Sequence, residues 1–373
     1  MQVTKKPLRI LIVTGVYPTK SRPHSGTFIK SQADSLVDAG LEVEVIHPRP
    51  GPVPVRYAVA TLRVFLKTLT GRFDIVHGHY GLWCLAARMQ WTTAVVASFL
   101  GDDLLGTPTA GGGYSKKAAL VVRVSRWLCR HVGAVIVKSE QMQKAAGGGD
   151  IAVIPNGVDF ELFHPIPREE ARAALSWDQG QNYILFGADP IIPRKNYALA
   201  QEAVERLHAK GIAAQLVIAN GLPQTKVVLY MNASNALLLT SLLEGSPNIV
   251  KEAMACNVPV VSVDVGDVPQ VIERTQGCKV CLRDPDALAA GLEEALQHTA
   301  PTTGRTDIMH LNRALVAEQV TAVYKQAMSE TPRHKWTGIL PSFQLSTLER
   351  SSLIGDRENF KPTDSNGSGH DRG

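Results

Sequence analysis

The stretch over residues 235–272 constrains the fold more than any other, because it reads as strand, helix and strand in immediate succession. An apolar run ends in the turn Glu-Gly-Ser-Pro-Asn, a short helical pattern follows, and a second apolar run leads into a Gly-Asp loop. Two strands joined through a helix pair in parallel. Parallel sheets bind ligands outside the carboxyl ends of their strands, so we expect a ligand site at the turn that holds Glu244.

The same pattern recurs along the chain. A chain of 373 residues exceeds what one hydrophobic core usually supports. Buried-strand patterns at 8–14 and 183–186 each begin a series of alternating strands and helices. We therefore predict an α/β fold with two domains, at residues 1–165 and 166–313. The residues from 331 to 373 are polar and lack periodicity, which predicts disorder.

Composition favours a cytoplasmic enzyme. The apolar content of 45% and charged content of 20% are typical of a soluble globular protein. The apolar runs fall short of the roughly 18 residues that a membrane-spanning helix needs. The first apolar segment lacks a signal-peptide cleavage pattern and runs into a Gly-Val-Tyr-Pro turn, which favours a buried strand.

The positive charge is concentrated in the first half of the chain. Residues 1–165 contain 19 Lys and Arg against 11 Asp and Glu, a balance of +8 within a total of +5. This balance predicts an anionic partner. The pattern at 116–131 predicts a basic amphipathic helix, which is either a solvated surface or a contact with an anionic membrane at its inner face.

Two glutamates lie close to the start of the predicted helix after residue 246, Glu244 in the turn that precedes the helix and Glu252 within it. Pro247 suits the first position of a helix, and the unpaired backbone N–H groups at such an end attract phosphate. A carboxylate accepts two hydrogen bonds from a vicinal diol, which predicts ribose as the partner of Glu252 and a sugar as the partner of Glu244. The alternative is a capped helix whose glutamates face solvent.

Two basic residues follow the first strand of the second domain. Arg194 and Lys195 lie in a loop after the predicted strand at 183–186. Arginine binds phosphate bidentately and lysine acts as a point charge, so the pair suits a diphosphate. The alternative is ordinary surface charge before a helix.

Three segments together resemble a known family. These are IPNGVDFELFHP, FGADPIIPRKN and EGSPNIVKEAMACNVPVVSVDVGDVPQVI, in which Glu-x7-Glu is the most specific feature. They resemble the retaining GT-B glycosyltransferases of the family 4 type over about residues 8–328. The resemblance implies two Rossmann-like domains that face each other across a cleft, and we expect the helix at 314–328 to pack back on the first domain.

The resemblance also implies how the site is divided. A nucleoside-diphosphate sugar, with uridine or guanosine as the base, would bind mainly to the second domain and the acceptor mainly to the first, with no metal and no further cofactor. Glu252 would bind the ribose, Glu244 the transferred sugar, and Arg194 with Lys195 the diphosphate. Backbone contacts would come from Ser246, Pro247, Asn248 and Ile249, and Gly26 would allow close approach in the first domain.

The chain departs from the family pattern in two places. Ala188 follows Gly187 where relatives commonly have an arginine, and the arginine here is at position 194. Leu100 stands where many relatives have the histidine of a His-Gly-x-Asp turn. This moves the expected active-site histidine to His79, which ends a short strand and is expected to face the cleft.

The implied activity is sugar transfer with retention to a saccharide or a lipid-linked acceptor, in cell-surface polysaccharide biosynthesis. A GT-B nucleotide-sugar epimerase is one alternative, and a glycosyltransferase-like binding subunit without activity is another. Nucleic-acid binding is poorly supported, because the triple-glycine loops lack the Gly-Lys-Ser/Thr ending of a P-loop.

Overall fold

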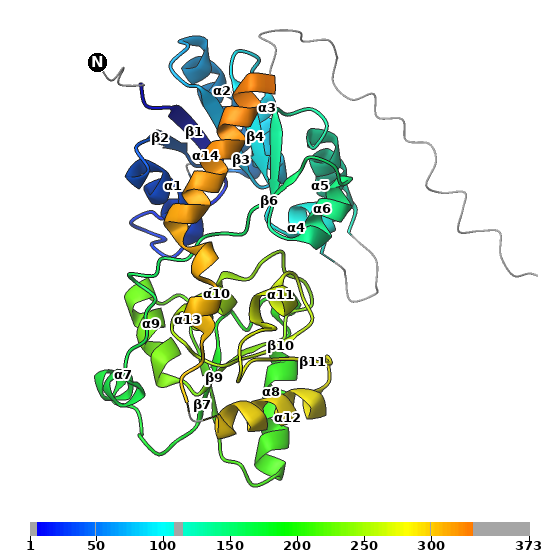
Figure 1. The fold of residues 1–373 in the computed structure, drawn as a ribbon. Coiled ribbons are helices and arrows are strands. Elements are labelled where there is room, and N and C mark those ends of the chain that lie inside the picture. Colours follow the sequence, from blue (N-terminus) through cyan, green and yellow to red (C-terminus); the bar gives the residue numbers. More distant parts are fainter. Residues whose placement is uncertain (1–5, 49, 108–114, 299, 331–373) are drawn as a thin grey trace, which may run out of the picture. The chain divides into compact units, whose positions relative to one another are not determined.

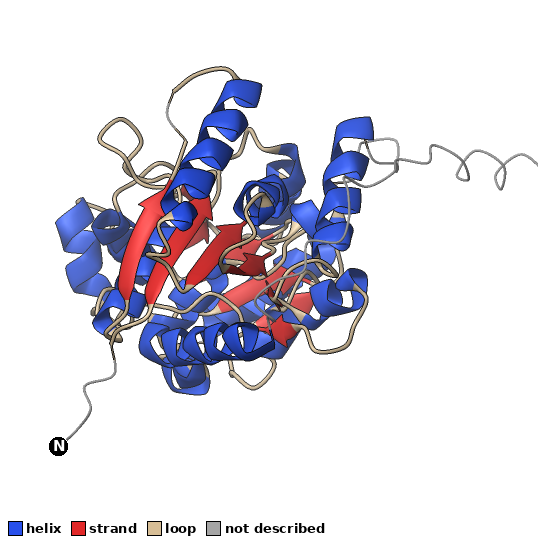
Figure 2. Ribbon diagram, turned by 90° about the horizontal axis from the view of Figure 1, so that it is seen from above, coloured by secondary structure: helices blue, strands red, loops and turns tan. Residues whose placement is uncertain are grey.

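Two parallel sheets with helices on their faces make up the part of the chain that the structure describes (Figure 1). The structure is a computed structural model that describes residues 6–48, 50–107, 115–298 and 300–330. Figure 2 shows helices on both faces of the strands. This arrangement is the doubly wound α/β architecture that the sequence predicted.

The first sheet is built from the strands before residue 154. Its order is β2-β1-β3-β4-β5-β6, and all neighbours that pair are parallel. The strands are β1 (Arg9–Thr14), β2 (Glu42–Ile46), β3 (Ile75–His79), β4 (Ala94–Ser98), β5 (Ala134–Val137) and β6 (Ala152–Val153). The helices between them are α1 (Thr27–Asp38), α2 (Val53–Leu69), α3 (Gly81–Arg88), α4 (Asp102–Leu105), α5 (Lys116–Leu128) and α6 (Glu140–Ala146).

The alternation of side chains along β1 explains why helices cover both faces of this sheet. Ile10 and Ile12 are fully buried in a cluster with side chains of α1. Leu11 and Val13 are fully buried on the other side, in a cluster with α2 and α3. Successive strand residues point to opposite faces, so one apolar strand supplies two cores.

The second sheet has the order β11-β10-β9-β7-β8, again with parallel pairing. Its strands are β7 (Tyr183–Phe186), β8 (Gln215–Ile218), β9 (Ala236–Leu239), β10 (Val260–Val263) and β11 (Lys279–Cys281). Its helical segments are α7 (Arg168–Leu175), η1 (Pro193–Lys195), α8 (Tyr197–Ala209), α9 (Gln224–Ala233), α10 (Asn248–Ala255), α11 (Val268–Ile272), α12 (Pro285–Gln297), α13 (Gly304–Asp307) and η2 (Met309–Leu311).

The last described helix, α14 (Arg313–Glu330), packs on the first sheet. Its Val316, Val320 and Tyr324 are buried in the same cluster as Ile10 and Ile12. The chain therefore returns to its first half after the second sheet is complete. The domain boundaries at residues 165 and 313 stay a prediction.

Some expected boundaries differ from the observed ones. The basic helix expected at 116–131 ends at Leu128, and the helix expected at 314–328 extends from Arg313 to Glu330. The predicted disorder of residues 331–373 lies outside the described residues. Within the described part of the chain, no helix is long and apolar enough to span a membrane.

Candidate active site

Both sheets have the strand order that opens a crevice at one edge. In each, the chain builds one side of the sheet and then crosses to the other, so the connections after β1 and β3, and after β7 and β9, diverge. Ligands of doubly wound sheets bind at such a switch point, outside the carboxyl ends of the strands. The topology therefore points to these four connections before any side chain is considered.

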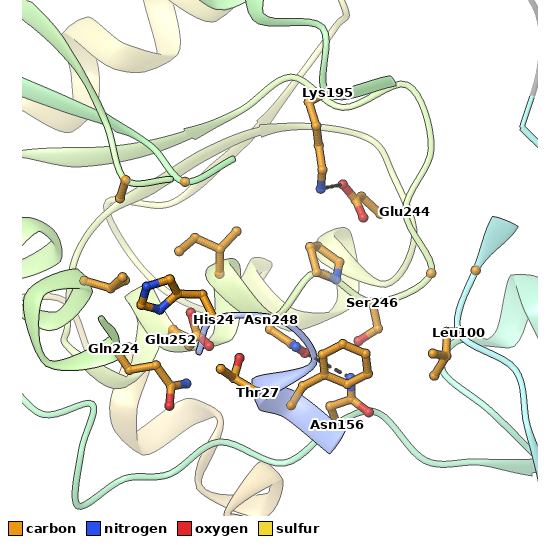
Figure 3. Close-up of a pocket in the computed structure, with 18 of the residues that line it drawn as sticks. His24, Thr27, Leu100, Asn156, Lys195, Gln224, Glu244, Ser246, Asn248 and Glu252 are labelled. Atoms are coloured by element: carbon orange, nitrogen blue, oxygen red, sulfur yellow. Dashed lines mark hydrogen bonds and ion pairs between the residues drawn. The ribbon is translucent and has the colours of Figure 1, made fainter. Parts of the chain in front are cut away.

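A cavity of about 480 Å³ lies where these connections meet (Figure 3). From the first half of the chain it is lined by His24, Thr27, Phe28, Tyr80, Leu100, Gly101, Asp102 and Asn156. From the second half it is lined chiefly by Arg194, Lys195, Leu222, Gln224, Val227, Glu244, Ser246, Pro247, Asn248, Ile249 and Glu252. All the residues that were predicted from the second half thus line one cavity.

The two predicted diphosphate cations are both paired with Glu244. The Lys195 ammonium donates to Glu244 Oε1, and Arg194 Nη1 lies 3.5 Å from Glu244 Oε2. Glu244 is the most buried of the three, with its side chain 10% exposed. The carboxylate therefore holds both cations in place before any ligand arrives, and the group as a whole keeps one positive charge.

The backbone around η1 explains how the cations reach Glu244. The Thr240 hydroxyl, just after β9, donates to the carbonyl oxygens of Lys195 and Asn196 at 3.0 and 2.9 Å. The Leu242 N–H donates to the Arg194 carbonyl at 2.8 Å. These bonds fasten the turn after β7 to the turn after β9, which is the switch point of the second sheet.

Helix α10 presents Glu252 to the cavity one turn beyond Asn248. Burial raises the pKa of the Glu252 carboxyl to about 7, against the opposing effect of Lys251. Gly187, at the end of β7, packs against the same helix: a Cβ there would lie 2.4 Å from Ile249 Cγ1. A side chain at position 187 would therefore push α10 away from β7.

A buried polar chain lies behind the turn. The Ser246 hydroxyl donates to Asp267 Oδ2 at 2.5 Å and accepts from Lys251 Nζ at 2.9 Å. Lys251 is 1% exposed and also donates to the Asn156 carbonyl at 3.2 Å. Burial lowers the pKa of Lys251, whereas Asp267 and Glu252 oppose that effect. Because the Ser246 side chain is engaged here, its backbone is the part left for a ligand.

Asn156 joins the two halves of the chain at the cavity floor. Its Nδ2 donates to Asn248 Oδ1 at 3.2 Å (Figure 3). Its carbonyl accepts from Lys251. Asn156 follows β6 of the first sheet, whereas Asn248 begins α10 of the second half. The segment IPNG thus has a local role in positioning α10.

Sequence matches agree with this geometry. Residues 10–157 match the glycosyl transferase 4-like domain, and residues 178–298 match the group 1 glycosyl transferases. Together the two matches cover more than half of the chain. The chain belongs to the group 1 glycosyltransferases of the family 4 type.

Named relatives share this family. The glycosyltransferase TuaC of Bacillus subtilis, provisionally named for teichuronic acid biosynthesis, is 24% identical over 76% of this chain and 88% of its own length. A D-inositol 3-phosphate glycosyltransferase of Mycobacterium marinum is 26% identical over 66% of this chain, which spans 61% of that relative.

Solved structures of similar proteins have the same GT-B fold. Sucrose-phosphate synthase from Thermosynechococcus elongatus superposes with a TM-score of 0.68 at 17% identity, over 88% of this chain and 100% of its own. HepE from Anabaena in complex with UDP superposes with a TM-score of 0.58 at 18% identity, over 85% of this chain and 100% of its own. A GT-B glycosyltransferase fold is therefore established for this chain.

Two residues of this glycosyltransferase that were predicted to belong to the site do not line the cavity. His79 was expected to face the cleft, but it is fully buried, and its ring centroid lies 4.1 Å from that of His77 with the two planes tilted by 35°. Strand β3 continues through His79, so alternation sends both rings to the same covered face. Within the described part of the chain, neither ring nitrogen of His79 has a hydrogen-bond partner.

Gly26 also stands beside the cavity rather than in its lining. It precedes α1 with φ of +71°, and a Cβ there would lie 2.6 Å from the Val16 carbonyl carbon. The close approach that requires glycine is therefore to the chain's own backbone. Its effect on the site is to turn the loop so that His24 and Thr27 line the cavity.

Several lining residues were not predicted from the sequence. His24, Thr27 and Tyr80 follow β1 and β3, and Gln224 follows β8. His24 and Tyr80 lie on irregular connections, whereas Thr27 and Gln224 are the first residues of α1 and α9, and a single position of either kind carries no periodic signal. Their shared feature, a position after the carboxyl end of a parallel strand, could have identified them.

Metal ligation has no evident site here. Among the residues that the structure describes, no group of three or more His, Cys, Asp or Glu side chains is arranged to hold a metal ion.

Proposed function

We propose that this glycosyltransferase transfers a sugar from a nucleoside-diphosphate sugar to a saccharide or lipid-linked acceptor, with retention at the anomeric carbon. The observation that carries the proposal is that Arg194 and Lys195 are held on Glu244 in the cavity that Glu252 also lines. In this proposal the diphosphate binds the two cations, and Glu252 accepts hydrogen bonds from the ribose hydroxyls.

The reaction needs positive charge beside the donor bond that is cleaved. As the bond from the anomeric carbon to the diphosphate oxygen breaks, negative charge grows on the diphosphate and the sugar becomes oxocarbenium-like. Cations fixed in advance stabilise that charge without reorganising. The acceptor oxygen then bonds to the same face of the anomeric carbon, and its proton passes to the departing phosphate oxygen. Glu244 holds the cations and a hydroxyl of the sugar.

We propose that the reaction needs no metal ion. Arg194 and Lys195 supply, at the diphosphate, the charge that a divalent cation supplies in other enzymes. The measurement is turnover after removal of divalent ions by a chelator, which we expect to match that of the untreated enzyme. A large loss that added Mg²⁺ restores would contradict this part of the proposal.

The acceptor is proposed from the relatives and from charge. The name of TuaC refers to teichuronic acid biosynthesis, and the first half of this chain carries the positive balance of +8 from 19 basic and 11 acidic residues. Both support a role in cell-surface polysaccharide biosynthesis, with an anionic or lipid-linked acceptor bound mainly by the first half.

The first experiment is a donor screen with purified protein. UDP- and GDP-sugars are offered with and without oligosaccharide acceptors, and released nucleoside diphosphate is detected by mass spectrometry. Transfer that depends on an acceptor, with the anomeric configuration kept, supports the proposal. An epimerised donor that appears without acceptor would favour the epimerase. Lack of turnover with every donor would favour a binding subunit.

Three substitutions test the roles of the site residues. Glu252→Ala should weaken donor binding about ten- to a hundredfold, because a charged hydrogen-bond acceptor is lost. Arg194→Ala and Lys195→Ala should lower kcat about a hundredfold or more. Lys210→Ala is the matched control, since Lys210 pairs with Glu293 at the surface. Wild-type kinetics in all three site variants would overturn these assignments.

A further inference from the structure

The outer face of α2 carries a row of exposed aliphatic side chains. The exposed fractions are 53% for Val55, 40% for Val59, 56% for Leu62, 54% for Leu66 and 52% for Leu69. The spacing is four, three, four and three residues, so at about 100° per residue the side chains fall within an arc of roughly 80°. These five residues are called the α2 stripe.

Within the part of the chain that the structure describes, the α2 stripe is left exposed. Helix α2 packs on the first sheet through its opposite face, where Ala60, Val64 and Thr68 are buried. Ordinary surface helices are apolar on the side toward the core and polar on the other. A contiguous exposed apolar patch of this kind usually marks an interaction surface.

Basic residues follow one edge of the α2 stripe. Arg56, Arg63 and Lys67 lie on the same flank of the helix, about a quarter turn from the stripe, and the helix contains no Asp or Glu. Lys67 pairs with Glu44 at 2.6 Å. On this geometry the helix presents apolar side chains bordered by positive charge.

An exposed tryptophan lies beside the same helix. Trp91 is 51% exposed, and its ring is 5.3 Å from that of Phe65 in an edge-on contact. Phe65 lies on the flank of α2 opposite to the basic residues. Tryptophan is enriched at the boundary between lipid and water, where an aromatic ring fits beside both apolar and polar groups.

Helix α5, for which the sequence left open a solvated surface or a contact with an anionic membrane, lacks such a stripe. Its Lys116, Lys117, Arg123 and Arg126 are exposed, but among its described residues Leu120 is the single exposed large aliphatic side chain. Positive charge without an apolar stripe gives attraction to an anionic surface but no insertion.

A second copy of the chain fits the α2 stripe less well than an anionic surface does. If two stripes packed antiparallel around a two-fold axis, each flank would face the same flank of the partner. The basic flank, with Arg56, Arg63 and Lys67, would then meet itself, and like charges in contact are unfavourable. An anionic surface complements the same residues.

We propose that α2 docks this protein on an anionic lipid surface. The α2 stripe inserts among the acyl chains next to the headgroups, while Arg63 and Lys67 contact the lipid phosphates and Trp91 lies at the boundary. The inference goes beyond the proposed transfer reaction and does not depend on it. It places the enzyme where a lipid-linked acceptor would be met.

The test is co-sedimentation of the full chain with vesicles. Vesicles that contain phosphatidylglycerol are compared with vesicles of phosphatidylcholine alone, and wild type should bind the former much more tightly. Leu62→Gln with Leu66→Gln should weaken binding about tenfold or more, and Arg63→Gln about fivefold. Leu120→Gln on α5 is the control and should bind as wild type does.

Thermal unfolding shows whether the variants fold, because substitutions at exposed positions usually change stability by less than about 0.5 kcal/mol. Equal sedimentation of wild type and the Leu62/Leu66 variant would overturn the proposal. The proposal would also be overturned if wild type formed a dimer that does not bind vesicles and that variant were a monomer. In that case a second copy of the chain would cover the α2 stripe. Nucleoside diphosphate release is measured separately, so failure of lipid binding and failure of the proposed reaction remain distinguishable.

Discussion

Glu252 shows how a residue that lines the cavity can oppose stability. Its carboxyl is half-buried in the cavity, and burial raises its pKa from 4.5 to about 7. Between these two values the folded protein binds more protons than the unfolded chain, so stability falls as the pH rises. The loss of stability from burying the charged carboxylate is absent below about pH 4.5 and complete above about pH 7. In the proposed function, the carboxylate is kept despite this cost because it accepts hydrogen bonds from the ribose.

Glu252→Gln should therefore stabilise the empty protein. The unfolding free energy should rise by up to about 3 kcal/mol near pH 8 and by about 1 kcal/mol near pH 5. Donor binding should weaken about tenfold, because an amide is a poorer acceptor than a carboxylate. Denaturant unfolding at both pH values and a donor titration measure these effects.

The control for that experiment is Glu202→Gln, an equal change of charge on the exposed face of α8. It should leave both stability and donor binding unchanged. A Glu252→Gln protein that is less stable than wild type near pH 8 would show that its carboxylate stabilises the fold.

Helix α14 illustrates an effect at the scale of elements. Tyr324 is fully buried, and its hydroxyl lies 2.7 Å from His77 Nδ1, while His77 Nε2 lies 2.8 Å from Ser98 Oγ. Burial, with a smaller contribution from Lys138, lowers the pKa of His77 to about 3, so the ring is neutral at pH 7. One polar chain thus connects α14 to β3 and β4.

Tyr324→Phe should destabilise the protein by about 1–3 kcal/mol, because it leaves a buried ring nitrogen of His77 without its partner. The ring packing against the first sheet is kept. Tyr230→Phe, on the half-buried ring of α9, is the control and should cost less than about 0.5 kcal/mol. Denaturant unfolding of both variants measures the difference, and equal stabilities would show that the hydroxyl contact contributes little.

Strands were predicted from the sequence more accurately than helices. The predicted range 183–186 is that of β7, and the predicted range 8–14 contains β1, because a short apolar run bounded by turn residues fits a buried strand. Helix α9 was not predicted, since its apolar residues do not gather on one side. Its place in the fold is decided by packing against α7, which lies far away in the sequence.

Local sequence predicted several residues of the second half that line the cavity, but it did not predict how they contact one another. Lys195 and Glu244 stand at strand ends, and the topology brings the two together. Their ion pair was not predicted, because it depends on how the turns after β7 and β9 are bonded. The position of His79 was wrong, because whether β3 ends before or after it cannot be seen in a five-residue strand.

At the scale of the whole molecule, the cavity depends on the close approach of two glycine turns. Gly101 follows β4 of the first sheet, and Gly245 follows β9 of the second. A Cβ on Gly245 would lie 2.4 Å from the Leu100 carbonyl oxygen and 3.1 Å from Gly101 Cα. Both turns line the cavity, so the two halves of the chain complete it only when no side chain separates them.

Gly245→Ala should therefore act as a wedge between the two halves. The turns must separate by an ångström or so, and misplacement on that scale lowers turnover about a hundredfold. Overpacking should reduce the unfolding free energy by about 1–3 kcal/mol. Donor binding should change only a few-fold, because Arg194, Lys195 and Glu252 all belong to the second half. Gly180→Ala is the control, since its Cβ would meet only Asp178 Oδ1, at 3.6 Å. Loss of donor affinity in parallel with turnover would instead mean that Gly245 positions the donor itself.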